Sequence, residues 1–149
     1  MSIMSKEMKE LVGEHEAILA HMRSLTRTVE NLSAQPAVAR EKLWGYRQAL
    51  YDFKDAIWFH LDIDERVFKS ILGEGFTDDP IGEHQEIQRL VKDMIILADD
   101  SAIERCAQPE LDRFCGQLSE AFKKICKLIE LHIAKENAIL EKVQKALNY

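Results

Sequence analysis

The sequence predicts an all-α protein, an up-down-up-down antiparallel four-helix bundle built from two similar helical hairpins. Apolar residues recur at steps of three and four along most of the chain, which places them on one face of a helix with 3.6 residues per turn. No stretch alternates apolar and polar residues, so no strand is expected. The six glycines and three prolines lie mostly between the periodic stretches, where they mark short connections.

The first two helices are expected over residues 4–32 and 36–72. The periodic residues of the first are Met8, Leu11, His15, Ile18, Met22, Leu25 and Val29, and those of the second are Tyr46, Ala49, Phe53, Ile57, His60, Asp64, Val67 and Ile71. Pro36 marks the start of the second helix, because the first helical position does not need the N–H that proline lacks. Gly45 lies inside this helix at a cost of about 1 kcal/mol relative to alanine, for which close helix contact is one explanation.

The last two helices are expected over residues 80–99 and 109–147, with Pro80 and Pro109 at their starts. Residues 73–79 form the clearest loop, and Asp79 is the expected N-cap of the third helix. The fourth helix has the longest periodic stripe, and Gly116 interrupts it as Gly45 interrupts the second. Together these elements form one domain spanning residues 1–149.

Composition excludes several classes of function. A net charge of −6 argues against a nucleic-acid partner, because phosphate binding favours an excess of lysine and arginine. The longest apolar run, residues 94–98, is too short to cross a membrane. Three cysteines without a C-x-x-C pair form neither a disulfide framework nor a zinc knuckle. They suit a reducing compartment, so a cytoplasmic location is expected.

An internal repeat is the most informative feature of the chain. The segment GEHEAI at residues 13–18 returns as GEHQEI at residues 82–87, 69 positions later. FHLDIDERVF at residues 59–68 likewise resembles LHIAKENAIL at residues 131–140, 72 positions later. The chain therefore contains two similar hairpins, each with a histidine on its first helix and a His-x-x-x-carboxylate pair on its second.

The repeat places six polar residues on apolar helix faces, where they are expected to point into one bundle interior: His15, His60, Asp64, His84, His132 and Glu136. Histidine and carboxylate four residues apart lie one turn apart on the same face, separated by about 6 Å. Two carboxylates buried without cations repel each other and lose hydration, which is unfavourable. A pair of metal ions supplies the missing positive charge, and a mixed imidazole and carboxylate set suits iron, manganese or zinc.

A simpler interpretation is a bundle whose histidines are only packed in the core. A lone buried histidine is more often a satisfied core residue than a ligand, and a single H-x-x-x-E is a weak signal. The joint placement of four of the five histidines at repeat-related positions favours metal binding. His21, the fifth, is expected at the surface, and Glu14, Glu16, Glu83 and Glu86 are expected to be solvated neighbours rather than ligands.

The order His, His-x-x-x-Asp/Glu, His, His-x-x-x-Glu resembles the hemerythrin-like (HHE cation-binding) domain family, and the resemblance covers residues 15–136. It implies a four-helix bundle with a non-haem di-iron centre, that is, two iron ions bridged by an oxo or hydroxo group. By this resemblance His15 and His60 bind one iron and His84 and His132 the other. Asp64 and Glu136 would then bridge the pair.

Two positions depart from the oxygen-carrying members of this family. Those proteins have a further histidine one turn after the third-helix histidine, where this chain has Gln88. The first bridging carboxylate is usually glutamate, whereas here it is Asp64, so the adjacent Glu65 is an alternative bridge. Two irons offer roughly twelve positions, of which about ten are filled, and the remaining two stay open or are taken by water, Gln88 or Glu65.

Three functions follow as expectations. The first is a binding protein for a small diatomic ligand, dioxygen or nitric oxide, acting in storage, delivery or sensing. The second is a di-iron enzyme or iron-handling stress protein that acts on nitric oxide or peroxide or donates iron for iron–sulfur cluster repair, because open metal positions favour reactivity. The third is a structural bundle without metal. A protein partner is not identified by the sequence.

Overall fold

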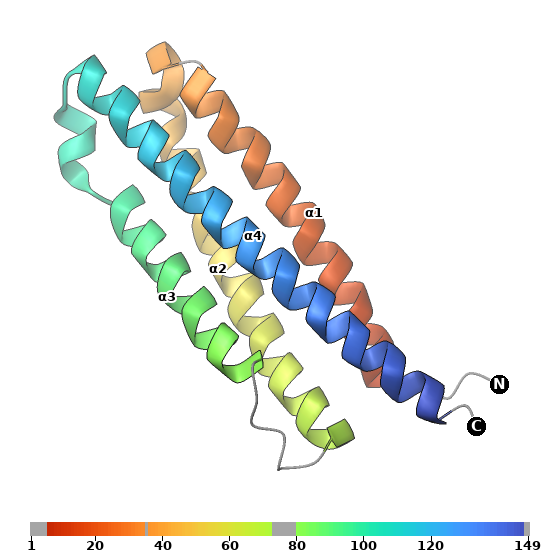
Figure 1. Cartoon of the computed structure of the whole chain (residues 1–149). Coiled ribbons are helices and arrows are strands. Elements are labelled where there is room, and N and C mark those ends of the chain that lie inside the picture. The colour runs from red at the N-terminus through yellow and green to blue at the C-terminus, as the bar shows by residue number, and fades with distance from the viewer. Residues whose placement is uncertain (1–5, 35, 73–79, 148–149) are drawn as a thin grey trace.

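Four long helices make up the fold, which we describe from a computed structural model that covers residues 6–34, 36–72 and 80–147. They are α1 (Lys6–Ala34), α2 (Pro36–Leu72), α3 (Pro80–Ala98) and α4 (Gln108–Leu147), with a short 3₁₀ helix, η1 (Ser101–Arg105), between α3 and α4. The helices lie side by side, and the start of α1 and the end of α4 are at the same end of the bundle (Figure 1). The described residues contain no strand, so the all-α class is confirmed.

The predicted helix boundaries agree with the observed ones to within two residues wherever the structure describes them. α2 begins at Pro36 and α3 at Pro80, as expected for prolines at first helical positions. The expected loop over residues 73–79, with the N-cap Asp79, lies outside the described residues. η1, which occupies the connection between α3 and α4, was not among the expected elements.

Arg47 of α2 binds both η1 and the end of α3. Its guanidinium donates to the backbone oxygens of Ala98 (2.5 Å) and Asp100 (3.4 Å) and to the Glu104 carboxylate (2.6 Å). The carbonyls at a helix C-terminus lack partners within the helix, so a guanidinium placed there satisfies them and interacts favourably with the helix dipole. Arg47 thereby joins α2 to the α3–η1 corner.

The buried side chains form two apolar clusters along the bundle. The larger one begins near Leu32 and Leu43, where α1 ends and α2 begins. It extends along the bundle to Ile18, Leu61, Ile87 and Ile133. The smaller one contains Met8, Leu11, Val67, Phe68 and Leu140. On α1, α2 and α4, five of the six predicted site residues fall between members of these two clusters, and the sixth, His84, lies on α3 before Ile87 of the larger cluster. The core is therefore apolar on both sides of one buried polar layer.

Close helix contact does not explain the glycines inside the helices. A Cβ atom added at Gly45 or Gly116 would meet no other atom within 4 Å. The sequence-based suggestion that these glycines allow helices to approach each other is therefore wrong.

Gly116→Ala is expected to stabilise the protein by about 1 kcal/mol, because alanine restricts the unfolded chain and favours the helix. Urea unfolding of the variant should show a higher midpoint with an unchanged slope. A lower midpoint would mean that the glycine has a structural role that the open space around it does not reveal.

Candidate metal centre

All six residues that the repeat singles out are buried in the polar layer. α1 contributes His15, α2 His60 and Asp64, α3 His84, and α4 His132 and Glu136. Their exposed fractions range from 0 to 3%. The two histidine–carboxylate pairs share a helix face because they are four residues apart. The structure therefore brings together every residue of the predicted site.

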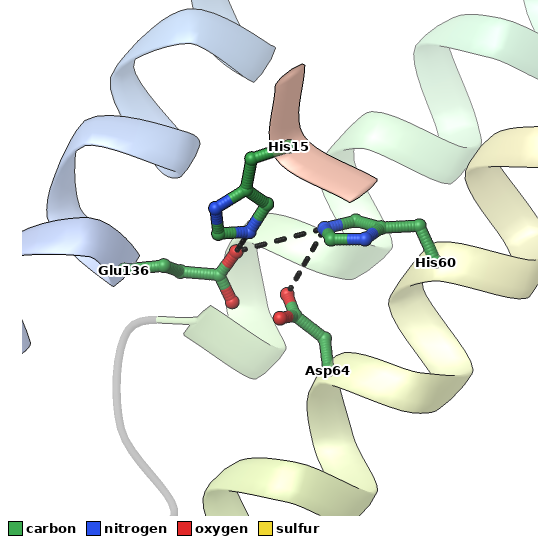
Figure 2. Close-up of side chains that lie close together, drawn as sticks. All are labelled: His15, His60, Asp64 and Glu136. Atoms are coloured by element: carbon green, nitrogen blue, oxygen red, sulfur yellow. Dashed lines mark hydrogen bonds and ion pairs between the residues drawn. The ribbon is translucent and has the colours of Figure 1, made fainter. Parts of the chain in front are cut away.

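One half of the site is formed by His15 and His60, whose rings meet edge to face with centroids 4.8 Å apart. His15 Nε2 lies 3.1 Å from Glu136 Oε1. His60 Nε2 points between the two carboxylates, 3.7 Å from Asp64 Oδ2 and 3.8 Å from Glu136 Oε1. Figure 2 shows these four side chains converging from three helices.

The other half is formed by His84 and His132, with ring centroids 4.7 Å apart. Their Nε2 atoms are 3.1 Å from each other and lie 3.2 and 3.3 Å from Asp64 Oδ2. His132 Nε2 is also 3.2 Å from Glu136 Oε1. Each carboxylate therefore contacts histidines of both halves.

The arrangement can hold metal ions in two groups that share both carboxylates. One group contains His15 and His60, the other His84 and His132, and Asp64 and Glu136 belong to each. Within a group all candidate ligand atoms lie within 4.8 Å of one another. Asp64 and Glu136 are thus the two side chains that the candidate ligand groups have in common.

Four polar side chains, which we call the outer acceptors, bind the other ring nitrogen of each histidine. With Nε2 facing the centre, each Nδ1–H donates to an oxygen. His15 pairs with Asn137 (2.7 Å), His60 with Glu14 (3.2 Å), His84 with Glu65 (3.1 Å) and His132 with Glu83 (3.4 Å). Such partners fix the tautomer and orientation of metal-binding histidines and raise their basicity.

The outer acceptors were missed in the sequence, although the repeat contained a signal for them. Glu14 and Glu83 each precede a site histidine, and Glu65 and Asn137 each follow a site carboxylate. The expectation that Glu14 and Glu83 are merely solvated is wrong, because their side chains are only 26% and 15% exposed and each binds a histidine. Glu16 is exposed, as expected.

The structure distinguishes between Asp64 and Glu65 as the inner carboxylate. The Asp64 side chain is fully buried and belongs to both ligand groups, whereas that of Glu65 is 49% exposed and contacts His84 from outside. Gln88, one turn after His84, makes none of the hydrogen bonds described for the site within residues 80–147. His21 is half-buried against the Phe53 ring rather than at the surface, and it lies outside both ligand groups.

The carboxylates and imidazoles of the site change one another's pKa values. Burial alone would lower the pKa of His132, but hydrogen bonds with Asp64 and Glu136 raise it to about 10. Burial would also lower the pKa of His60, but the nearby Glu136 and Asp64 carboxylates raise it. Burial raises the pKa of Asp64, while for Glu136 hydrogen bonds from His132 and His15 outweigh burial and lower the pKa. The site therefore favours positive charge at its centre.

Three buried polar atoms of the site lack a hydrogen-bond partner among the described residues: His60 Nε2, Asp64 Oδ1 and Glu136 Oε2. A buried polar atom without a partner costs about 1–3 kcal/mol, so native structures rarely leave several of them together. Imidazole nitrogens and carboxylate oxygens are the kinds of atom that coordinate metal ions in proteins. The donor set thus fits a pair of iron, manganese or zinc ions, which would bind to these atoms.

The metal-free protein is expected to lose stability as the pH rises from about 6.5 to 10. A group whose pKa is raised in the folded state stabilises it below its unfolded pKa and loses that effect as the pH approaches the folded value. His132 follows this rule, with a folded pKa of about 10 against 6.5 unfolded. Urea unfolding midpoints at several pH values measure how steeply the stability falls with pH. His132→Gln should flatten this dependence, and a midpoint that rises with pH would contradict the assignment.

No helix in the described part of the chain is both long enough and apolar enough to cross a membrane. Comparisons of the chain with protein-family models, with curated proteins and with solved structures found no match. The geometry of the site itself therefore carries the functional argument.

Proposed function

We propose that this chain is an up-down-up-down bundle of two hairpins that holds a non-haem di-iron centre and binds dioxygen or a related diatomic ligand. The observation that carries the proposal is the pair of buried ligand groups joined by Asp64 and Glu136. The order of these residues in the sequence, which resembles that of the hemerythrin-like family, supports iron over other metals. When bound, iron supplies a redox-active ion with positions open to a small ligand.

The surroundings of the site suit such a ligand. Apolar clusters lie on both sides of the polar layer, with buried Ile18 and Leu61 in one and Leu11 and Val67 in the other. These side chains limit the access of water and of protons to the centre. The outer acceptors hold each histidine ring in one orientation, so the ligand atoms need little rearrangement when ions bind.

Metal analysis together with optical spectroscopy tests the proposal. The protein loaded anaerobically with iron(II) should contain about two irons per chain, the number that its two ligand groups can hold. Exposure to dioxygen should produce a charge-transfer absorption band, and nitric oxide should produce a different one. Iron-loaded protein whose spectrum responds to neither gas would refute diatomic binding.

Reactivity is a second candidate, favoured by the small number of protein ligands. The two groups contain six side chains in total, and neither Glu65 nor Gln88 adds to them. Two ions with roughly twelve coordination positions would keep some open for a substrate such as nitric oxide or peroxide. Catalytic consumption of either compound by the iron form, lost in His60→Ala, would establish an enzyme. Stoichiometric binding without turnover would establish a binding protein, and transfer of iron to a cluster-free acceptor would establish iron donation.

A further inference from the structure

The two halves of the proposed metal centre differ in the outer acceptors that support them. His84 and His132 both donate to carboxylates, those of Glu65 and Glu83. In the other half His60 donates to Glu14, but His15 donates to the neutral amide oxygen of Asn137. A carboxylate acceptor makes an imidazole a stronger metal ligand than a neutral acceptor does. This difference favours tighter binding at the His84–His132 half.

The inner carboxylate Asp64 shows the same asymmetry. Its Oδ2 atom is 3.2 Å from His84 Nε2 and 3.3 Å from His132 Nε2, but 3.7 Å from His60 Nε2. The Asp64 carboxylate therefore places its negative charge closer to the His84–His132 half, although Asp64 and His60 lie on the same helix.

The spacing of the histidine nitrogens agrees with this. The Nε2 atoms of His84 and His132 are 3.1 Å apart. Two nitrogens at right angles around one ion, each at about 2.1 Å from it, would be about 3.0 Å apart, so these two are already placed for one ion.

We propose that the two metal positions are unequal: the His84–His132 position binds its ion first and more tightly, and the His15–His60 position is the exchangeable one. This inference rests on the proposed dinuclear centre. At limiting metal the chain would carry one ion, held by His84 and His132. Residues Glu65 and Asn137, which occupy equivalent places in the repeat, are the positioning residues that create the difference.

Lys135 works in the opposite direction. Its Nζ lies 3.0 Å from Glu83 Oε2 and partly neutralises that outer acceptor. The lysine side chain is 55% exposed, so water and salt screen its charge. Glu83 accepts from His132 through its other oxygen, Oε1, so the pairing with the imidazole is kept. Lys135 contacts neither Glu65 nor Asn137 in the described interactions, so the contrast between these two acceptors is kept.

Stepwise titration of the metal-free chain with cobalt(II) under anaerobic conditions tests the inference, because cobalt(II) absorbs visible light in mixed nitrogen and oxygen sites. The wild type should bind two ions in two steps whose affinities differ by about 10-fold or more. Glu65→Gln should weaken the tighter step by about 10- to 100-fold, and Asn137→Asp should strengthen the weaker step by about 10-fold. In both variants the affinities of the two steps should become more similar.

Glu16→Gln is the matched control, because it removes an exposed carboxylate next to His15 that is outside the site. It should leave both steps unchanged. Two equal steps in the wild type would overturn the inequality while leaving the metal centre intact, as would Glu65→Gln acting on the weaker step. Failure of cobalt(II) to bind, or binding of only one ion per chain, would instead overturn the dinuclear centre, and with it this inference.

Discussion

His132→Ala is expected to cause the largest loss of stability of any substitution in the site, together with loss of metal. His132 is 1% exposed, and its Nε2 lies 3.3 Å from Asp64 and 3.2 Å from Glu136. Its raised pKa favours the cationic imidazolium beside these buried carboxylates in the metal-free protein. Removing one partner of a buried ion pair costs about 3–5 kcal/mol, and a protein of this size melts about 2–4 °C lower per kcal/mol.

The melting temperature of His132→Ala should therefore fall by roughly 10 °C, and its metal content should fall by at least one ion per chain. Thermal melts followed by circular dichroism and metal analysis by mass spectrometry measure the two effects. His21→Ala is the matched control, because His21 is a half-buried histidine outside both ligand groups. It should keep its full metal content, and equal metal loss in the two variants would contradict the assignment.

Addition of metal is expected to stabilise the folded chain strongly. The ligands come from all four helices, so the unfolded chain holds them together only at a large cost in conformational entropy. An ion at 100 times its dissociation constant adds about 2.7 kcal/mol, so two ions should raise the melting temperature by about 10–20 °C. Anaerobic melts with and without iron(II) measure this shift, and a chelator should reverse it.

The same comparison tests the simpler interpretation of a purely structural bundle. If the histidines were only packed in the core, chelation would leave the melting temperature unchanged and no metal would be purified with the protein. Asp64→Asn with Glu136→Gln provides a control, because it keeps the shape of both side chains but removes their charges. That double variant should lose the metal-dependent shift.

The ligand set itself could be found without a structure, because it rests on helical period and on repetition. His60 and Asp64, like His132 and Glu136, share a face for the local reason that four residues make about one turn. The two halves repeat this pattern on apolar stripes, and burial of those stripes brings the polar residues inside. Each step depends on residues near one another in the sequence, which is why the pattern could predict that these six side chains are buried together.

Other features depend on contacts between distant residues and could not be predicted in this way. Arg47 holds η1 and the end of α3 from a position more than 50 residues earlier in the chain. No periodicity marks a guanidinium that reaches free carbonyl groups on another helix. The open space beside Gly45 and Gly116 likewise depends on how the helices pack.

The amino-acid sequence alone thus determined the helices, their apolar faces and the six buried polar residues of the candidate site, since 3.6-residue periodicity is a local property of the chain. Only the tertiary structure decided what each histidine meets on its outer side and how far Asp64 reaches across the centre. The partners of His15 and His84, Asn137 and Glu65, are set by the rotation and spacing of neighbouring helices. A difference of one charge there acts across helix interfaces, which sequence spacing does not encode.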